Sequence, residues 1–261
     1  MPDPSAPGGL ADPILTFRGV TKRFGPKVVY EDCTLDVYKG ETLTIIGGSG
    51  TGKSVLLKML TGLLTADSGN IVAFGQEVTK LSDREMIPLR KRIAMLFQSG
   101  ALFDSLTVAD NIKFPLREHR WGSEADMNAR VEEVLDMVGL PGSQLLKPAE
   151  LSGGMKKRVG LARSIAIQPD VVLYDEPTTG LDPINVRRIN GLILRLQEKL
   201  GVTSVVVTHD MDTVFTVSNR IAMLHERRIA FTGTLEETRA STLPWLSSFI
   251  AGGRGTLDED E

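Results

Sequence analysis

The sequence predicts an α/β fold in which a mostly parallel sheet carries helices on its faces. Three observations support this fold class. Short β-branched runs alternate with segments whose apolar residues recur at helical spacing. The run 41–46 ends directly at a glycine-rich loop, and a helix-like segment follows that loop. Residues from about 99 to 167 lack strong strand signals, so we expect a helical insertion between strands of the sheet.

The individual elements follow in chain order from the same patterns. Runs of apolar and β-branched residues predict strands at residues 14–20, 28–37, 41–46, 71–74, 93–97, 171–174, 202–208 and 221–225. Apolar residues spaced three and four apart predict helices at residues 53–64, 127–138, 155–167 and 186–200. The sequence has no internal repeat and no second loop of the same glycine-rich pattern.

The composition is that of an ordinary globular protein, and it argues against several functional classes. The 261 residues suffice for one large domain or two small ones, with 41% hydrophobic and 24% charged residues. A net charge of −3 does not suggest a broad basic face for nucleic acid, and we interpret the basic clusters at 90–92 and 156–158 as solvated helix faces. Cys33 is the only cysteine, which rules out an intrachain disulfide and a Cys-rich zinc site and fits a reducing cytoplasm.

The two ends of the chain predict tails rather than folded elements. Residues 1–13 are rich in Pro, Gly and Asp and lack the basic start and apolar stretch of a signal peptide, so we expect a flexible N-terminal tail. We expect residues 251–261 to form an acidic C-terminal tail. No apolar run approaches the roughly 18–20 residues needed to span a bilayer. Any work at a membrane would therefore depend on partners that hold the chain there.

The clearest chemical motif lies between the predicted strand 41–46 and the predicted helix 53–64. It matches G-x-x-x-x-G-K-[ST], the phosphate-binding pattern of P-loop NTPases, and consists of Gly47, Gly48, Ser49, Gly50, Thr51, Gly52, Lys53 and Ser54. Glycines lack the Cβ atoms that would hold the backbone away, so successive N–H groups and the helix N-terminus can point at a triphosphate. Lys53 would reach the β- and γ-phosphates, and Ser54 would hold Mg²⁺. A plain glycine-rich turn is the weaker interpretation in this strand–loop–helix context.

Two carboxylates, Asp175 and Glu176, follow the apolar strand 171–174. By itself, such a strand end is usually only a strand that reaches solvent. Beside a phosphate loop, however, Asp175 would act on the Mg²⁺ ion, usually through water. Glu176 would then polarise the attacking water as a general base. The pair therefore extends the prediction from ATP binding to ATP hydrolysis.

The segment 151–155, Leu-Ser-Gly-Gly-Met, resembles the LSGGQ signature of ABC transporter ATPases. Ser152 can cap the helix that begins near Met155, and Gly153 and Gly154 leave backbone N–H groups accessible. The segment would then be a second phosphate-facing helix N-terminus, although a simple helix cap is the competing interpretation. Met155 replaces the usual Gln. Because phosphate contacts would come from Ser152 and the glycine backbone, we expect activity to survive this change.

Other residues match the same family in the family's order. Phe24 resembles the aromatic residue that stacks on adenine, and Gln98 resembles the Q-loop glutamine that contacts Mg²⁺ and the attacking water. His209 resembles the switch histidine near the γ-phosphate, and residues 180–182, Gly-Leu-Asp, resemble the D-loop. The resemblance implies an ABC ATP-binding domain over residues 14–250.

The resemblance implies a fold, a catalytic set and a partner. The fold is the ABC ATPase form of the P-loop NTPase fold, with a mostly parallel sheet core, an antiparallel N-terminal β subdomain and a helical subdomain inserted at residues 99–167. The implied catalytic residues are Glu176, His209 and Gln98, and the implied Mg²⁺ residues are Ser54, Gln98 and Asp175, partly through water. ABC ATPases pair head to tail, so that the loop of one copy and the signature of the other enclose each ATP. With one copy of each motif, this chain would work as a homodimer.

Four stretches resemble one subgroup, the ATPases of Mla-type and Mce-associated lipid transporters. They are residues 97–108, 114–119, 151–166 and 174–184. The resemblance implies a bacterial system that moves phospholipids between the inner and outer membranes. The ATPase would lie at the cytoplasmic face of the inner membrane, under a multi-spanning permease that contacts residues 101–111. An MCE-domain lipid-binding protein would lie on the far side, and some members add a small STAS-domain protein. The sequence does not identify the lipid or the direction of transport.

The sequence leaves two alternatives open. An importer ATPase for amino acids or another small solute would share every catalytic motif. A non-transport ABC ATPase of DNA repair, chromosome structure or translation would usually bring a second ATPase domain, long coiled-coil insertions or zinc-binding cysteines. The sequence contains none of these features. We therefore expect membrane partners and no nucleic acid.

Overall fold

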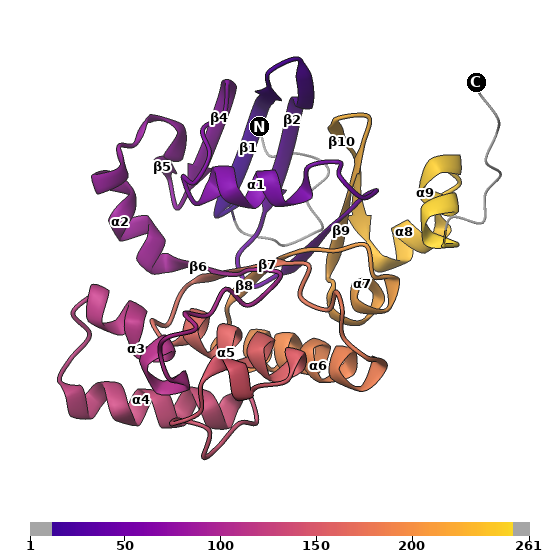
Figure 1. The fold of residues 1–261 in the computed structure, drawn as a ribbon. Coiled ribbons are helices and arrows are strands. Elements are labelled where there is room, and N and C mark those ends of the chain that lie inside the picture. The colour runs from indigo at the N-terminus through magenta and orange to yellow at the C-terminus, as the bar shows by residue number, and fades with distance from the viewer. Residues whose placement is uncertain (1–11, 253–261) are drawn as a thin grey trace.

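The computed structural model describes residues 12–252 and contains two sheets with helices around them (Figure 1). The strands are β1 (Leu15–Phe24), β2 (Lys27–Val37), β3 (Thr42–Ile46), β4 (Ser68–Ala73), β5 (Gln76–Glu77), β6 (Ile93–Leu96), β7 (Val171–Asp175), β8 (Thr203–Val207), β9 (Arg220–His225) and β10 (Arg228–Thr234). The helices are α1 (Lys53–Leu60), α2 (Asp83–Arg92), α3 (Val108–Glu118), α4 (Glu124–Met137), α5 (Gly153–Ile165), α6 (Pro183–Leu200), α7 (Met211–Val217), α8 (Leu235–Ala240) and α9 (Pro244–Ile250), with 3₁₀ turns at Val78–Lys80 and Pro148–Glu150. Most of the two predicted tails, namely residues 1–11 and 253–261, lies outside the described residues.

The larger sheet has the strand order β10-β9-β3-β8-β7-β6. The pairs from β9 to β6 are all parallel, and only β10 runs antiparallel to its neighbour β9. Every residue of β3, β7 and β8 is buried, as expected for parallel strands covered on both faces. The mostly parallel core predicted from the sequence is therefore confirmed. The carboxyl ends of these strands meet at one edge, which is where ligands bind in such sheets.

The smaller sheet has the order β2-β1-β4-β5, and all its pairs are antiparallel. Leu15 of β1 pairs with Val37 on one side and with Ala73 on the other, so β1 lies at the centre of this sheet. Alternate residues of β1, including Leu15 and Phe17, are buried against the rest of the protein. This is the antiparallel N-terminal sheet that the family resemblance implied.

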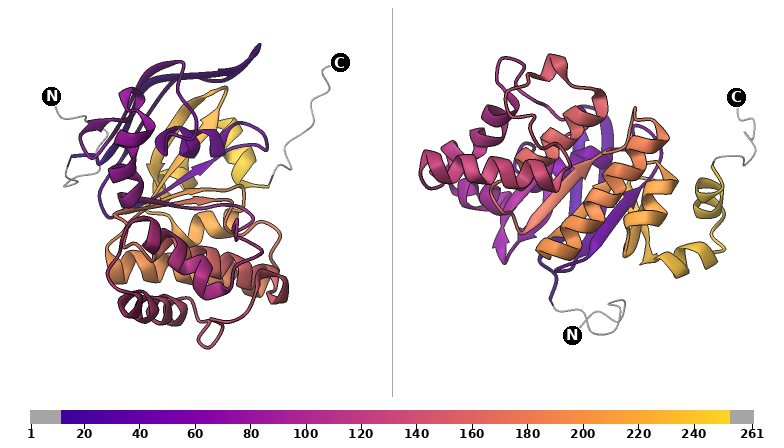
Figure 2. Two further views of the ribbon diagram at one scale, coloured as in Figure 1. Left: turned by 60° about the vertical axis from the view of Figure 1, so that its left-hand side comes forward. Right: turned by 90° about the horizontal axis from the view of Figure 1, so that it is seen from below.

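Different elements cover the two faces of the larger sheet. The antiparallel sheet and α1 lie on one face, whereas α3, α4, α5 and α6 lie on the other (Figures 1 and 2). Phe17, Leu57 and Leu173 belong to the core on the first face, and Ile112 and Leu161 belong to the core on the second. Each such buried side chain contributes about 1.5–3 kcal/mol relative to exposure. The two cores pack against both faces of the sheet and fix the strand ends from which the edge loops begin.

The segment that was expected to be a helical insertion has no strand. Residues 99–167 contain α3, α4, a 3₁₀ turn and α5. The next helix, α6, shows clear start and stop signals: Asp182 caps it by accepting the backbone N–H groups of Ile184 and Asn185, and Pro183 occupies its first position. Gly201 ends α6 in a left-handed conformation with φ 61°. These signals place the helix three residues earlier than the apolar spacing alone had placed it.

Several elements had no individual prediction from the sequence: α2, α3, α7, α8, α9, β5 and β10. Helix α2 is charged at six of its ten positions and contains Pro88, so it lacks the apolar spacing that predicts a helix. Its available signal was a capping box formed by Ser82 and Glu85. Helices α8 and α9 span only six and seven residues. The helix predicted at 53–64 ends at Leu60, because Gly62 turns the chain with φ 69°.

The interpretation of the two basic clusters as solvated helix faces was wrong for three of their members. Arg90 Nε donates to the Thr61 carbonyl at 3.1 Å, and Arg158 Nη1 donates to the Gly139 carbonyl at 2.9 Å. Lys157 is only 6% exposed. Long cationic side chains can lay their apolar stems on the protein and hydrogen-bond the carbonyls that a neighbouring helix leaves free at its C-terminal end. Arg90 and Arg158 do this for α1 and α4.

Candidate nucleotide-binding and catalytic site

The glycine-rich loop connects β3 to α1 at the carboxyl edge of the larger sheet. Gly52 immediately precedes α1 with φ 106°, a conformation that L side chains rarely adopt. A Cβ atom on Gly52 would lie 2.2 Å from Val29 Cγ1, and one on Gly47 would lie 2.8 Å from the Leu224 carbonyl oxygen. These two glycines are therefore required by the fold. Residues 48–50 between them are exposed and leave the loop open to a ligand.

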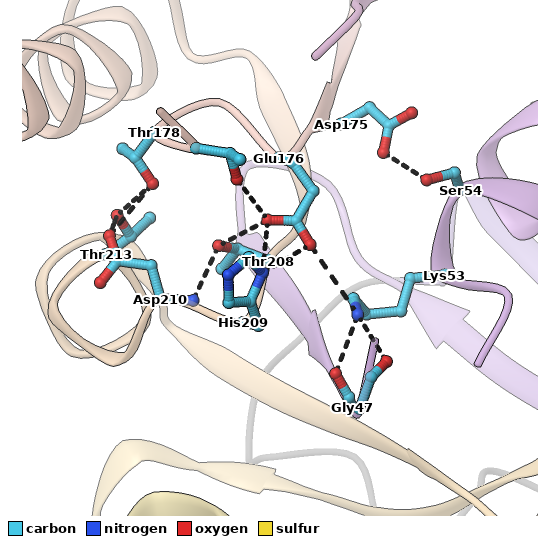
Figure 3. Close-up of polar contacts among 12 residues, drawn as sticks. Gly47, Lys53, Ser54, Asp175, Glu176, Thr178, Thr208, His209, Asp210 and Thr213 are labelled. Carbon is cyan, nitrogen blue, oxygen red and sulfur yellow. Dashed lines mark hydrogen bonds and ion pairs between the residues drawn. The ribbon is translucent and has the colours of Figure 1, made fainter. Parts of the chain in front are cut away.

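Lys53 lies inside this loop rather than extending away from it. Its Nζ atom donates to the carbonyl oxygens of Gly47 at 2.8 Å and Gly48 at 3.0 Å (Figure 3). The same atom is 3.8 Å from Glu176 Oε1, and the residue is 7% exposed. Burial lowers the pKa of Lys53, and the charges of Glu176 and Asp175 oppose that shift. A cation is thus held at the base of the loop by partners within the same chain.

Ser54, the first residue after that lysine, reaches across to the end of β7. Its hydroxyl donates to Asp175 Oδ1 at 2.5 Å. The two residues are 121 positions apart in sequence, and the sheet brings them together. Burial raises the pKa of Asp175, whereas the hydrogen bond from Ser54 lowers it. A hydroxyl and a carboxylate in contact at the carboxyl edge of the sheet are oxygen donors of the kind that Mg²⁺ prefers.

Glu176 follows Asp175 and adopts a left-handed backbone conformation with φ 50°, which is uncommon for a residue with a side chain. Its N–H donates to the Val207 carbonyl of β8 at 2.9 Å, which fixes the turn. Its carboxylate accepts a hydrogen bond from Thr179 Oγ1 at 3.0 Å and lies 3.0 Å from His209 Nδ1 (Figure 3). Glu176 and His209, which the sequence assigned to catalysis, are therefore direct neighbours.

Lys157 of α5 is a contributor that the sequence analysis missed. Its Nζ atom donates to the Thr179 carbonyl at 2.6 Å and to the Glu176 carbonyl at 3.3 Å. Burial lowers the pKa of Lys157, and the nearby Glu176 charge raises it. The side chain ties the first turns of α5 to the backbone that carries Glu176. A lysine inside a charged cluster gave no sequence signal of this burial.

A second missed group lies directly beyond His209. Asp210 Oδ2 accepts hydrogen bonds from Thr178 at 3.0 Å and from Thr213 at 2.6 Å, and Thr213 also donates to Asn190 Oδ1 at 3.1 Å. Asp210 also caps α7. The group links the segment after Glu176 to the segment that carries His209. The Thr-Thr pair at 178–179 lies in a stretch used only for family resemblance, and no periodic pattern marked it.

The remaining predicted site residues lie apart from this cluster. Ser152 caps α5 by accepting the Met155 N–H at 3.3 Å, and it is exposed. Within the described residues, no hydrogen bond or ion pair joins the loop, Asp175, Glu176 or His209 to any of Phe24, Gln98, Ser152, Gly153 and Gly154. Phe24 is 44% exposed at the end of β1, and Gln98 is exposed just after β6. The structure therefore assembles one part of the predicted site and leaves the other part at its surface.

Comparison with known proteins decides the family. A family model described as ABC transporter matches residues 30–179. The chain belongs to the ABC transporter family. As a member of this family, it is an ATP-binding subunit that couples ATP hydrolysis to transport. None of the helices between residues 12 and 252 combines the length and apolar character that a bilayer-spanning segment requires.

Individual relatives of this ABC subunit have names that refer to different cargoes. It is 41% identical to the intermembrane phospholipid transport system ATP-binding protein MlaF of Haemophilus influenzae, over 92% of this chain and 90% of that protein. It is 39% identical to the probable ribonucleotide transport ATP-binding protein mkl of Mycobacterium leprae, over 97% of this chain and 72% of that protein. Among solved structures, a dimeric ATP-binding cassette in a post-hydrolysis state bound to ADP and Pi matches with a TM-score of 0.78 and 31% identity, over 85% of this chain and 98% of that one.

Proposed function

We propose that this chain hydrolyses ATP to power phospholipid transport between the inner and outer membranes of a bacterium. The observation that carries the cargo assignment is the similarity to MlaF, which extends over 92% of the chain. The mkl relative, whose name refers to ribonucleotides, is less similar at 39% identity. An importer of amino acids or another small solute is the weaker alternative.

In this proposal, the loop binds the triphosphate of ATP. The open backbone at residues 48–50 would supply N–H donors, and the N-terminus of α1 would add its positive dipole end. Lys53 already lies at the base of the loop, so its Nζ atom would exchange the Gly47 and Gly48 carbonyls for phosphate oxygens. Phe24, at the exposed end of β1, would stack on the adenine ring.

The residues at the end of β7 fit a magnesium ion. Ser54 and Asp175 already touch each other, and Gln98 would join them, partly through water. Among residues 12–252, no group of three or more His, Cys, Asp and Glu side chains could hold a metal ion by itself, so phosphate oxygens would complete the coordination. When bound, Mg²⁺ supplies charge neutralisation at the phosphates. The chain's contribution is to hold a hydroxyl and a carboxylate at one point.

Glu176 would act as the general base that takes a proton from the attacking water. Thr179 and the neighbouring His209 fix the orientation of its carboxylate, and the Val207 carbonyl fixes its backbone. His209 is exposed on its outer side and would approach the γ-phosphate. Because Lys157 holds the Glu176 carbonyl, the signature helix and the base are mechanically linked within one subunit.

The exposed signature residues Ser152 and Gly153, together with Gly154, would complete the ATP site of a second copy of this chain. Ser152 caps α5, so the helix N-terminus there points outward into solvent. The solved cassette with 31% identity is a dimer. A homodimer would bring the loop of each copy against the signature of the other, so that each ATP is enclosed by both.

The permease would dock near residues 101–111. Phe103 within this segment and Phe114 just after it are 43% and 41% exposed, their ring centroids lie 4.7 Å apart, and they line a depression of about 340 Å³. Exposed aromatic side chains beside a concave surface are typical of a protein interface. The further partners in this proposal are an MCE-domain lipid-binding protein and, in some systems, a STAS-domain protein. The chain would then work at the cytoplasmic face of the inner membrane, held there by the permease.

Mass spectrometry of the proteins that co-purify with this chain from detergent-solubilised membranes tests the cargo. A multi-spanning permease together with an MCE-domain protein would support phospholipid transport. A periplasmic solute receptor with its permease would favour the importer alternative. Recovery of ribosomes or DNA, with no membrane protein, would overturn the transporter assignment.

A further inference from the structure

A small depression lies between the C-terminal end of α4 and the helices α5 and α6. Its volume is about 380 Å³, and its lining residues are Val138, Gly139, Arg158, Arg188, Leu192 and Arg195. None of these residues belongs to the nucleotide cluster. Three of them are arginines and none is acidic, so the lining carries a formal charge of +3.

The three arginines lack partners for most of their donors. Arg188 and Arg195 are exposed, and within residues 12–252 neither forms an ion pair or a hydrogen bond. Arg158 donates Nη1 to the Val138 and Gly139 carbonyls, but its Nε atom is buried without a partner. Burial lowers the pKa of Arg158, and the charge of Arg188 lowers it further. Both residues line the same depression, so their guanidinium groups face a common space.

This arrangement is unfavourable for a protein by itself. A buried N–H donor without an acceptor loses hydrogen bonds to water and gains none in return. Like charges around a common space also repel each other. By contrast, the surface arginine Arg117 pairs with both Asp110 and Glu124. An anion in the depression would satisfy the free donors and remove the repulsion.

We propose that Arg158, Arg188 and Arg195 form a binding site for a phosphate-bearing anion. A guanidinium group presents paired N–H donors whose geometry matches two phosphate oxygens. A phosphate group concentrates up to two negative charges in a volume that the depression holds, whereas a carboxylate carries one. The phosphate belongs either to a free anion or to a lipid headgroup, and both offer the same oxygens.

The site lies next to the signature helix. Arg158 directly follows Lys157, which holds the carbonyls of Glu176 and Thr179. Arg188 and Arg195 lie on α6, whose N-terminus packs Asn185 against Gly154. A bound phosphate would therefore tie α5 to α6 about one turn further along these helices than the contact between Gly154 and Asn185.

Calorimetric titration with inorganic pyrophosphate tests the site, with the full chain first saturated with ADP and Mg²⁺ so that the phosphate loop is already filled. The variant is Arg188→Gln/Arg195→Gln, because both side chains are exposed and their loss leaves the Arg158 contacts with α4 intact. The matched control is Arg84→Gln/Lys91→Gln, which removes two exposed charges from α2. We expect the pocket variant to bind pyrophosphate at least about tenfold more weakly than the wild type, and the control to bind within about twofold.

Flotation with vesicles identifies the source of the phosphate. The same three proteins are mixed with vesicles of phosphatidylcholine alone or with added phosphatidylglycerol. Loss of binding to the anionic vesicles in the pocket variant, but not in the control, would assign a lipid headgroup. A difference in the pyrophosphate titration alone would assign a free phosphate anion. Equal behaviour of wild type, pocket variant and control in both experiments would overturn the proposal.

Discussion

The phosphate loop and the signature segment differ in how far a single chain organises them. At the loop, the side chains are joined by contacts within the chain: Lys53 to Glu176, Ser54 to Asp175, and Glu176 to His209. At the signature, Ser152 caps its own helix and is otherwise exposed, and a Cβ atom on Gly153 would lie more than 4 Å from every other segment that the structure describes.

The difference shows that the two parts of the ATP site are organised to different degrees within one chain. The loop side is pre-organised, because Lys53 and Asp175 already have partners within the chain at the places where ATP and its ion would bind. The signature side is positioned but open. Gly154 packs against Asn185 so closely that a Cβ atom would lie 2.8 Å from it, whereas its neighbour Gly153 faces free space. Substitutions on the two sides should therefore fail in different ways, and four variants test this.

Glu176→Gln should have the largest effect. The amide keeps the shape of the side chain and can still accept from Thr179, but it cannot take a proton from water. We expect turnover to fall by about 10²–10⁴-fold, the usual contribution of a general base, while ATP binding persists. Phosphate release and nucleotide binding measured on one preparation check this. If the variant no longer binds ATP, Glu176 is needed to organise the loop rather than to act as the base.

Ser152→Arg should break the signature side without disturbing the loop side. The position is exposed, so the isolated subunit should lose only the α5 cap, about 1 kcal/mol of stability, and should keep its affinity for ATP. A long cation facing a second copy's nucleotide would prevent closure, and we expect turnover to fall at least about tenfold, which corresponds to roughly 1.4 kcal/mol of lost contact energy. ATP-dependent dimerisation, followed by light scattering in the Glu176→Gln background, is the second measurement. Normal turnover and normal dimerisation would contradict the shared site.

Much of the fold could be predicted from the sequence because it depends on local patterns. β-branched runs such as 203–207 are buried over their whole length, and they gave clear strand signals. Helix α2 could not be predicted in the same way, because only Met86 and Leu89 are buried and charges fill the rest. Helices α8 and α9 are too short for periodicity to emerge. Their positions depend on packing against β9 and β10, including the stacking of Trp245 on His225.

The candidate site could be predicted only where its residues follow a motif. The loop and the Asp175–Glu176 pair occur at fixed spacing, and the structure places them together. Lys157 was misjudged, because burial of a lysine depends on carbonyls 19 and 22 residues away and leaves no local trace. The Asp210 network was missed for the same reason: its threonines come from two separate segments. The roles assigned to Phe24 and Gln98 stay predictions.

Lys157→Met tests whether the signature helix and the base are mechanically linked. The substitution keeps the length and apolar stem of the side chain but leaves the Glu176 and Thr179 carbonyls without their donor, at a cost of about 1–3 kcal/mol. We expect a lower Tm and a fall in kcat of a few fold, with KM for ATP nearly unchanged. Lys157→Gln is the matched control, since its amide can still donate and should recover most of the loss. A kcat equal to wild type in Lys157→Met would show that the contact is structural only.

The smallest expected effect is that of Asp175→Asn on the loop side, which should raise stability while it impairs activity. Burial raises the pKa of Asp175, so between the ordinary and the raised pKa the folded chain binds more protons than the unfolded chain. Stability from this group is therefore fully present below its ordinary pKa and is lost as the pH rises through the raised value. At neutral pH the ionised, desolvated carboxylate lowers the free energy of unfolding, and Asp175→Asn removes that charge while its carbonyl can still accept from Ser54.

Without nucleotide, the variant should melt a few degrees higher than wild type at neutral pH. The difference should shrink as the pH falls, because wild-type Asp175 then becomes neutral as well. ATP turnover should be impaired in the same variant. A variant that melts below wild type at neutral pH would contradict this prediction. It would show that the contacts of the carboxylate stabilise the folded chain by more than its desolvation destabilises it.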